Sequence, residues 1–529
     1  MIRPASRWMT RCAMALLLGG SALASSANAQ DQAQTDTAAT LHADTPGATV
    51  DRHIFSQFAE HLGYGIYGGI WVGPNSKIPN IKGYRKDVVE ALRALHVPLV
   101  RWPGGCFADE YHWRDGIGPR ANRPVRINTH WGGVTEPNSF GTHEFMDFAE
   151  LIGADAYVSG NVGSDAPSAM EEWVQYITAP EGALAQERAK NGRKEPWKLP
   201  YFGIGNELWG CGGNMRPDDA AGITRRYATF VKPPYGVKIQ KVASGANGPD
   251  TNWTEVMMRE AGKQIDGIGL HYYTTPGETS GAPKGRGSAT TFTEVDYART
   301  MAKTWRMEEL LTKHSAIMDK YDPARRVNLA VDEWGIWTDV EPGTNPGFLY
   351  QQNSLRDALL AAVNINIFVH HAERVRMTNI AQMVNVLQSM ILTDGAKMVL
   401  TPTYHAFDMY RPWQDGTALP LDLPKTWYNR EEWTAPAVTG SAVRGKDGAV
   451  HVALVNIDPT QPHHLEIALT GLNAAQVSGR ILTAGRVQDV NDFATPARVA
   501  PVAFTGATIR DGKLSLDVPA KALVVLDLR

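Results

Sequence analysis

The stretch Tyr201-Phe202-Gly203-Ile204-Gly205-Asn206-Glu207-Leu208-Trp209-Gly210 decides how the rest of the chain is interpreted. It opens with a short apolar run, which is typical of a strand buried on both faces, and the run ends in an Asn-Glu pair. A carboxyl group at the point where a buried strand becomes a loop is partly desolvated. Desolvation raises its pKa and suits it to general acid catalysis. For a single Glu, an exposed loop carboxylate would be the better interpretation.

The same pattern recurs in Arg326-Val327-Asn328-Leu329-Ala330-Val331-Asp332-Glu333-Trp334-Gly335, a second apolar strand that ends in carboxylates. Successive side chains of a strand point to opposite faces, so only one of Asp332 and Glu333 is expected to face a pocket. Two acidic strand ends on one scaffold are what glycoside hydrolysis requires. One carboxyl group protonates the leaving oxygen, and the other attacks or activates water.

Length and composition describe an ordinary globular protein. The 529 residues can form one large domain of roughly 250–350 residues and a smaller one. The formal net charge of −3 gives no reason to expect nucleic acid or an anionic membrane as a partner. The 15 Trp and 17 Tyr suit stacking against sugars, but they equally suit a large core.

The first 29 residues have the pattern of a signal peptide. Arg3, Arg7 and Arg11 form a basic region, residues 12–24 are apolar, and Ala27-Asn28-Ala29 resembles a cleavage site. The apolar run is too short to cross a bilayer. We therefore expect an exported protein, either periplasmic or secreted, whose polar segment 30–50 precedes the first domain.

Strand and helix patterns alternate through residues 51–400. The predicted strands are 54–60, 98–105, 156–161, 201–207, 242–245, 265–273, 326–335 and 375–379. Eight such units predict an α/β fold, a parallel (β/α)8 TIM barrel. An open doubly wound sheet is the alternative, but no Gly-rich phosphate loop follows the first strand. Residues 401–529 carry short alternating segments between Gly, Pro and Asp turns, which predict an all-β, jelly-roll-like sandwich without a substantial helix.

The carboxyl ends of barrel strands meet at one mouth, so residues at predicted strand ends are candidate site residues. These residues are mostly hydrogen-bonding, as a pocket for a hydroxylated ligand requires: Glu60, Arg101, Cys106, Asn161, Asn206, Glu207, His271, Tyr273, Glu333 and Asn379. Cys106 and Cys211 could form a bridge at this mouth, although two separate buried thiols are the favoured interpretation. No residues have zinc-ligand spacing.

Several motifs together resemble the α-L-arabinofuranosidases of glycoside hydrolase family 51. They occur in the family's order across residues 50–400: Phe58-Ala59-Glu60-His61-Leu62-Gly63, the run 81–88, Arg101-Trp102-Pro103-Gly104-Gly105, Asp115-Gly116-Ile117-Gly118-Pro119, Gly205-Asn206-Glu207, Asp332-Glu333-Trp334 and Ala381-Gln382-Met383-Val384-Asn385. The resemblance implies an exo-acting, retaining double displacement on arabinan- or arabinoxylan-type saccharides. Nothing in the sequence requires a metal or organic cofactor. The resemblance also implies a homo-oligomer, commonly a hexamer.

The resemblance assigns a role to each matching residue. Glu207 would be the acid/base and Glu333 the nucleophile, with carboxyl groups about 5–5.5 Å apart. The other matches would bind the sugar or orient the carboxylates; they are Glu60, Arg101, Cys106, Trp131, Asn206, His271, Tyr273, Trp337 and Gln382. Cys106 stands where many relatives have Asn, and Leu208-Trp209-Gly210 replaces their usual Met-Asp-Gly. Both departures leave contacts around the leaving group open.

Two other functions compete with this interpretation. An endo-β-glucanase or xylanase could use the same acid/base and nucleophile positions on the same scaffold. A catalytically silent sugar-binding protein is a different class, and the presence of both Glu207 and Glu333 weighs against it. A separate binding role for the C-terminal sandwich also stays open.

Overall fold

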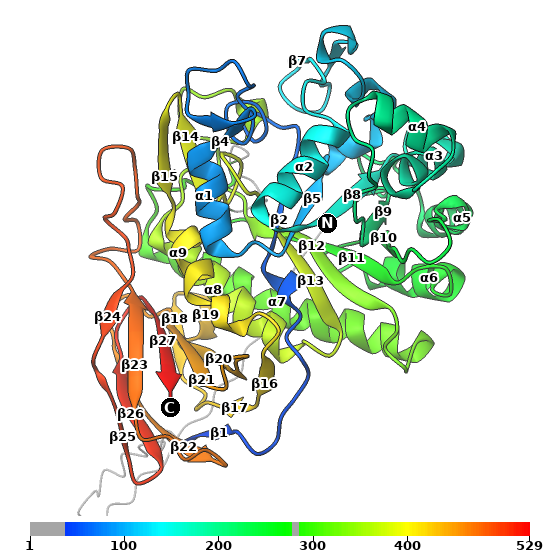
Figure 1. The fold of residues 1–529 in the computed structure, drawn as a ribbon. Helices are drawn as coiled ribbons and strands as arrows, with labels where there is room; N and C mark the ends of the chain where they lie inside the picture. Colours follow the sequence, from blue (N-terminus) through cyan, green and yellow to red (C-terminus); the bar gives the residue numbers. More distant parts are fainter. Residues whose placement is uncertain (1–37, 278–284) are drawn as a thin grey trace, which may run out of the picture. The chain divides into compact units, whose positions relative to one another are not determined.

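The computed structural model describes residues 38–277 and 285–529, and the predicted signal peptide lies outside them. Eight parallel strands close into a barrel in the order β2-β5-β8-β9-β10-β11-β12-β13 (Figure 1). They are β2 Ser56–Phe58, β5 Leu99–Trp102, β8 Asp155–Gly160, β9 Tyr201–Ile204, β10 Gln240–Asn247, β11 Gly267–Thr274, β12 Asn328–Ile336 and β13 Val375–Ala381. The predicted TIM barrel is confirmed.

Helices alternate with these strands because each places an apolar face on the barrel. In α1, for example, Val88, Leu92 and Leu95 recur at helical spacing and are buried. The helices are α1 Lys86–Leu95, α2 Thr142–Ile152, α3 Pro167–Thr178, α4 Ala183–Lys190, α5 Pro217–Phe230, α6 Thr251–Ala261, α7 Glu294–Tyr321, α8 Leu355–His370 and α9 Pro402–Met409. Within the described residues, no helix is both long and apolar enough to cross a membrane.

The first barrel strand is shorter than predicted. Residues Arg52–Phe55 form a 3-10 turn, η1, in which the Asp51 side chain accepts a hydrogen bond from the backbone N–H of His53. This local side-chain bond competes with extension of the strand, so β2 begins only at Ser56.

The C-terminal region is a sandwich of two sheets, in the orders β17-β1-β22-β26-β25 and β16-β20-β21-β27-β23-β24. The strands are β1 Ala38–His42, β16 Thr417–Leu419, β17 Leu421–Asp422, β20 Val438–Arg444, β21 Val450–Asn456, β22 His463–Thr470, β23 Val477–Leu482, β24 Val502–Phe504, β25 Ala507–Arg510, β26 Lys513–Val518 and β27 Ala522–Leu528. The sequence did not predict that β1, from the N-terminal segment, would pair in parallel with β22.

The sandwich packs on α8, which is buried along nearly its whole length (Figure 1). Trp413 donates its indole N–H to Ser441 Oγ at 3.1 Å, and Tyr297 donates its hydroxyl to the Ile457 carbonyl at 2.6 Å. A short helix, α9, lies at the start of this region, where no substantial helix was predicted.

Minor elements complete the connections. They are β3 Asn80–Ile81, β4 Tyr84–Arg85, η2 Cys106–Asp109, η3 Trp113–Gly116, η4 Arg120–Asn122, β6 Arg126–Ile127, β7 Thr135–Glu136, η5 Pro346–Phe348, β14 Ile391–Asp394, β15 Lys397–Leu400, η6 Arg411–Trp413, β18 Trp427–Arg430 and β19 Trp433–Pro436.

Candidate active site

Glu333 lies inside strand β12 and is held by three neighbouring side chains. Its Oε2 accepts a hydrogen bond from Arg101 Nη1 at 2.9 Å, and its Oε1 accepts one from the Tyr273 hydroxyl at 2.8 Å. His271 Nδ1 lies 3.4 Å from Oε2. Donors therefore contact both carboxylate oxygens and fix the orientation that a nucleophile requires.

Asp332 also points into the barrel, so the expectation that only one of the two acids does so is wrong. Its Oδ2 accepts from the Tyr157 hydroxyl at 2.9 Å, and its Oδ1 lies 3.3 Å from His271 Nε2. The reason is a β-bulge: Ala330 and Glu333 are three positions apart in the sequence, whereas their partners on β11, Gly269 and His271, are two positions apart. The extra residue breaks the alternation of faces.

Glu207 lies beyond the end of β9, with its backbone in the left-handed region at φ 43°. Its Oε1 lies 3.0 Å from His271 Nδ1, so one imidazole contacts both predicted catalytic carboxylates. The preceding residue, Asn206, accepts a hydrogen bond on Oδ1 from Arg101 Nη2 at 2.6 Å. The two strand ends are therefore joined through Arg101 and His271.

Cys106 and Cys211 form a disulfide, contrary to the favoured interpretation of two separate thiols. The bond joins the β5 loop to the β9 loop beside Glu207, whose Oε2 lies 3.6 Å from the Cys211 sulfur and 3.9 Å from that of Cys106. Oxidised sulfurs carry no proton, so these are packing contacts rather than hydrogen bonds to the carboxylate.

Glu60 follows strand β2 and contacts the loop after β5. Its Oε1 accepts from the indole N–H of Trp131 at 2.8 Å and from the backbone N–H of Gly105 at 3.1 Å, and its Oε2 accepts from Gln382 Nε2 at 2.9 Å. Tyr273 packs edge-on against Trp337, with 5.1 Å between ring centroids. The eleven predicted site residues thus form two contact groups at the barrel mouth, one of eight residues around Glu207 and Glu333 and one of three residues around Glu60. Of the two other strand-end candidates, Asn161 donates to Ser164 Oγ in its own loop and to the Tyr111 carbonyl in the β5 loop, and Asn379 lies buried in β13.

The charges around the site shift several pKa values. Burial opposes charge on His271, but Glu333, Asp332 and Glu207 outweigh it and raise the pKa of His271 to about 10. Burial and the Glu333 charge raise the pKa of Glu207, although the hydrogen bond from His271 lowers it. The net rise is the direction that a general acid requires. Burial, together with Glu333, raises the pKa of Glu60 to about 7.

Two groups of possible metal ligands occur among the described residues: Glu207, His271 and Glu333, and Cys106, Glu207 and Cys211. The sulfurs of the second group are bonded to each other. In the first group, His271 has a raised pKa that keeps it protonated, and Glu333 accepts a hydrogen bond from the guanidinium of Arg101. Both cations already neutralise the carboxylates, so this arrangement suits proton transfer.

Sequence reasoning missed Asp109 and Tyr157. Asp109 lies in η2, outside the strand ends that were searched, and accepts three backbone hydrogen bonds. Burial raises the pKa of Asp109 to about 7, although the three backbone hydrogen bonds lower it. Tyr157 lies mid-strand in β8 and reaches Asp332 across the barrel interior. Only the inward alternation of β8 could have indicated it.

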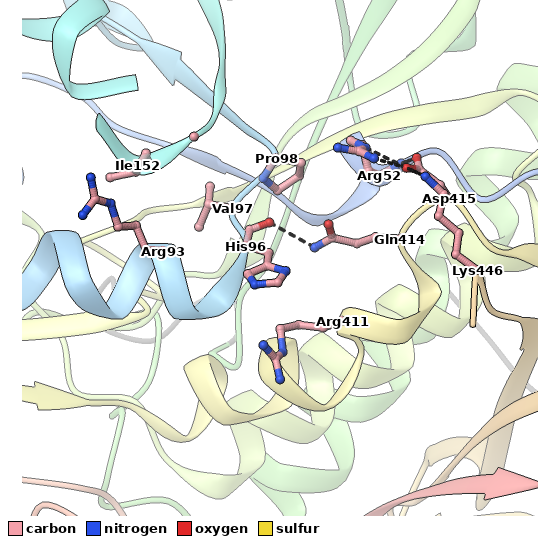
Figure 2. Close-up of a pocket in the computed structure, with 11 residues that line it drawn as sticks. Arg52, Arg93, His96, Val97, Pro98, Ile152, Arg411, Gln414, Asp415 and Lys446 are labelled. Atoms are coloured by element: carbon pink, nitrogen blue, oxygen red, sulfur yellow. Dashed lines mark hydrogen bonds and ion pairs between the residues drawn. The ribbon is translucent and has the colours of Figure 1, made fainter. Parts of the chain in front are cut away.

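A basic pocket of about 410 Å³ lies at the other end of the barrel and is not this site (Figure 2). It is lined by residues that precede strands, such as Arg52 before β2 and His96 before β5. Its one carboxylate, Asp415, pairs with Arg52 and Lys446. It therefore lacks the two carboxyl groups that glycoside hydrolysis needs.

Comparisons with known proteins agree with this geometry. Two family models match: the alpha-L-arabinofuranosidase 1 domain over residues 91–284 and the alpha-L-arabinofuranosidase C-terminal domain over residues 332–522. An intracellular exo-alpha-L-arabinofuranosidase of Bacteroides ovatus is 49% identical over 94% of this chain and 96% of its own. The crystal structure of the GH51 arabinofuranosidase from Xanthomonas axonopodis pv. citri has 58% identity and a TM-score of 0.91, covering 93% and 99% of the two chains. This chain belongs to the α-L-arabinofuranosidases of glycoside hydrolase family 51.

A more distant family 51 structure shares the architecture. The α-L-arabinofuranosidase from Thermotoga maritima, solved as an arabinose complex, is 28% identical with a TM-score of 0.81, and the match covers 93% of this chain and 99% of that one. As a member of the family, this chain is a glycoside hydrolase with a barrel and a β-domain.

The comparison corrects the predicted location. The Bacteroides ovatus relative is named intracellular, which points against the export that we predicted from residues 1–29. Those residues lie outside the described part of the chain. The Arg-rich, apolar and small-residue pattern alone was therefore not sufficient to assign export to this family 51 member.

Proposed function

We propose that this enzyme is a retaining, exo-acting α-L-arabinofuranosidase that removes terminal α-L-arabinofuranosyl residues from arabinan- or arabinoxylan-type saccharides. One observation carries the proposal: a carboxylate oxygen of Glu207 lies within 4.8 Å of one of Glu333. Retaining glycosidases keep their two carboxyl groups about 5–5.5 Å apart, whereas inverting enzymes separate them by about 6.5–9.5 Å. The exo-acting Bacteroides ovatus relative supports the same mode of action.

The reaction then has two displacements. Glu207 donates its proton to the leaving oxygen while Glu333 attacks the anomeric carbon, which breaks the glycosidic bond and forms a glycosyl-enzyme ester. Glu207, now ionised, removes a proton from water, and the resulting nucleophile releases arabinose and regenerates Glu333. The raised pKa of Glu207 suits the first step, and loss of the Glu333 charge in the ester lowers that pKa for the second.

The remaining residues bind the sugar or fix the carboxylates. Arg101 and Tyr273 orient Glu333 through hydrogen bonds to its two oxygens, and the positive His271 lies between the two acids. We assign the furanose hydroxyls to Asn206, Glu60 and Gln382. Trp131, Trp337 and the Cys106 sulfur form the walls around them. The expected homo-oligomer stays a prediction, which light scattering can test.

The test is the release of nitrophenol from a panel of aryl glycosides by the wild type and Glu333→Ala. Turnover of the α-L-arabinofuranoside alone is expected, and the variant should lose on the order of 10⁴-fold or more in kcat because the nucleophile is gone. NMR of the first-formed sugar should show the α-anomer. The β-anomer, or a preference for a β-glucoside or β-xyloside, would contradict the proposal. Release of arabinose from arabinan and arabinoxylan tests the substrate class.

A further inference from the structure

The carboxylate of Asp109 binds the backbones of two loops that follow different barrel strands. Its Oδ1 accepts from the N–H groups of Val162, at 2.7 Å, and Gly163, at 2.8 Å, just after β8. Its Oδ2 accepts from the N–H of Asn206 at 2.8 Å, just after β9. Asp109 itself belongs to η2 in the β5 loop and is 3% exposed. One buried side chain therefore joins three adjacent strand ends.

The backbones around Asp109 are packed too closely to accommodate side chains. A Cβ built on Gly163 would lie 2.9 Å from the Cβ of Asp109 and 3.1 Å from its carbonyl oxygen. A Cβ on Gly212 would lie 2.9 Å from Oδ2. Ser164 Oγ also donates to the Asp109 carbonyl at 2.9 Å. Glycine at both positions allows the direct approach of backbone to carboxylate.

The residue after Asn206 needs such support. Glu207 has φ 43°, a conformation that costs a non-glycine residue on the order of 1–3 kcal/mol and persists only when its surroundings fix it. The Asp109 bond fixes the Gly205–Asn206 peptide, one peptide unit before the one that joins Asn206 to Glu207. On the other side, the Glu207 carbonyl accepts from the N–H groups of Gly210, at 2.7 Å, and Gly212, at 3.1 Å.

We propose that Asp109 is a positioning residue for the acid/base: its contacts with Val162, Gly163 and Asn206 hold the Glu207 backbone so that the carboxyl group meets the leaving oxygen. The inference rests on the proposed acid/base role of Glu207. Asp109 makes no contact with Glu207's carboxyl group, so it acts through the backbone alone. A displacement of a catalytic group by about 1 Å can lower the reaction rate roughly 10²-fold.

Asp109→Asn is the decisive variant. Asn keeps the size but has one acceptor oxygen, so an amide N–H2 must face either Asn206 N–H or the pair from Val162 and Gly163. We would measure kcat/KM on 4-nitrophenyl, phenyl and methyl α-L-arabinofuranosides. Because a poor leaving group needs the proton from Glu207, we expect losses of roughly 10- to 100-fold on the methyl substrate and less than about threefold on the nitrophenyl one.

Two controls separate positioning from a general loss of folded enzyme. Asp322→Asn removes a carboxylate that accepts from the Val327 N–H at 2.7 Å just before β12, at the other end of the barrel. It should lower kcat/KM equally, if at all, on the three substrates. Glu207→Gln should show the leaving-group dependence in its strongest form.

The outcomes are distinct. An equal loss on all substrates, or none, in Asp109→Asn would overturn the inference while Glu207→Gln still shows the dependence. A Glu207→Gln variant without leaving-group dependence would instead overturn the acid/base assignment. If Asp109→Asn does not fold, Gly163→Ala, which displaces the same loop, is measured in its place; equal losses there would overturn the inference equally.

Discussion

The ends of β9 and β12 carry the two acids of the site but hold them in different ways. Glu333 lies within strand β12, directly after its bulge, and the strand continues to Ile336; side-chain donors from other strands contact the Glu333 carboxylate directly. Glu207 lies after its strand has ended, in a left-handed conformation, and its loop is fixed through the backbone of Asn206 and by the Cys106–Cys211 bond. The sheet fixes one acid, and contacts between loops fix the other.

The difference matches what each group must do. A nucleophile attacks along one line and stays ionised until it reacts, so a strand and two donors suit it. An acid/base has to gain and lose a proton within one cycle and reach both the leaving group and water. The Glu207 side chain is accordingly the more exposed, 18% against 10% for Glu333. Changes that separate the two strand ends should therefore have separable effects.

Removing the disulfide should have the largest effect, on stability. Replacing Cys106 and Cys211 with Ser opens a covalent loop of 105 residues, whose closure stabilises a fold by roughly 4–5 kcal/mol in the chain-entropy account. We expect that loss in the free energy of unfolding, measured by denaturant titration. We also expect kcat/KM to fall more for methyl than for 4-nitrophenyl arabinofuranoside, because the bond holds the Glu207 loop.

Reductant supplies the control for this variant. Dithiothreitol should destabilise the wild type by a similar amount and leave the double Ser variant unchanged. A double variant as stable as the wild type, with an unaltered leaving-group preference, would mean that β9 does not depend on this link and that the contrast between the two strand ends is smaller than the geometry indicates.

The sequence predicted the barrel and both acids because these depend on period-two strands, helical spacing and short motifs near strand ends. It placed Asp332 wrongly because a bulge is set by pairing with β11, which no local pattern in β12 records. It missed Asp109 because the carboxylate of that residue binds backbone N–H groups. Almost every residue type has a backbone N–H, so the sequence does not identify such partners. The Cys106–Cys211 bond needed the distance between two loops, which only the folded barrel provides.

His271 contacts both strand ends, so its titration should appear in the stability of the fold. Its pKa is raised from about 6.5 when unfolded to about 10 when folded, so the folded state binds more protons between these values. Stability from this group is complete below about pH 6.5 and is lost as the pH rises through 10. The difference in unfolding free energy between wild type and His271→Gln should shrink by roughly 3–5 kcal/mol between pH 7 and 10. A constant difference would show that the folded imidazole is neutral.

The smallest effect should come from Tyr273→Phe, which removes one donor from Glu333 and keeps the ring that packs on Trp337. A hydrogen bond to a charged group contributes about 1.5–3 kcal/mol, so kcat/KM should fall roughly 10- to 100-fold. The loss should be similar for methyl and 4-nitrophenyl arabinofuranosides, because the nucleophile attacks in both reactions while the proton matters in only one. Tyr404→Phe, which removes a hydroxyl bonded to the Ala91 carbonyl at 2.9 Å, is the matched control and should leave kcat/KM unchanged. If Tyr273→Phe instead affected the methyl substrate alone, its hydroxyl would serve the acid/base, and the two ends of the site would not be held independently.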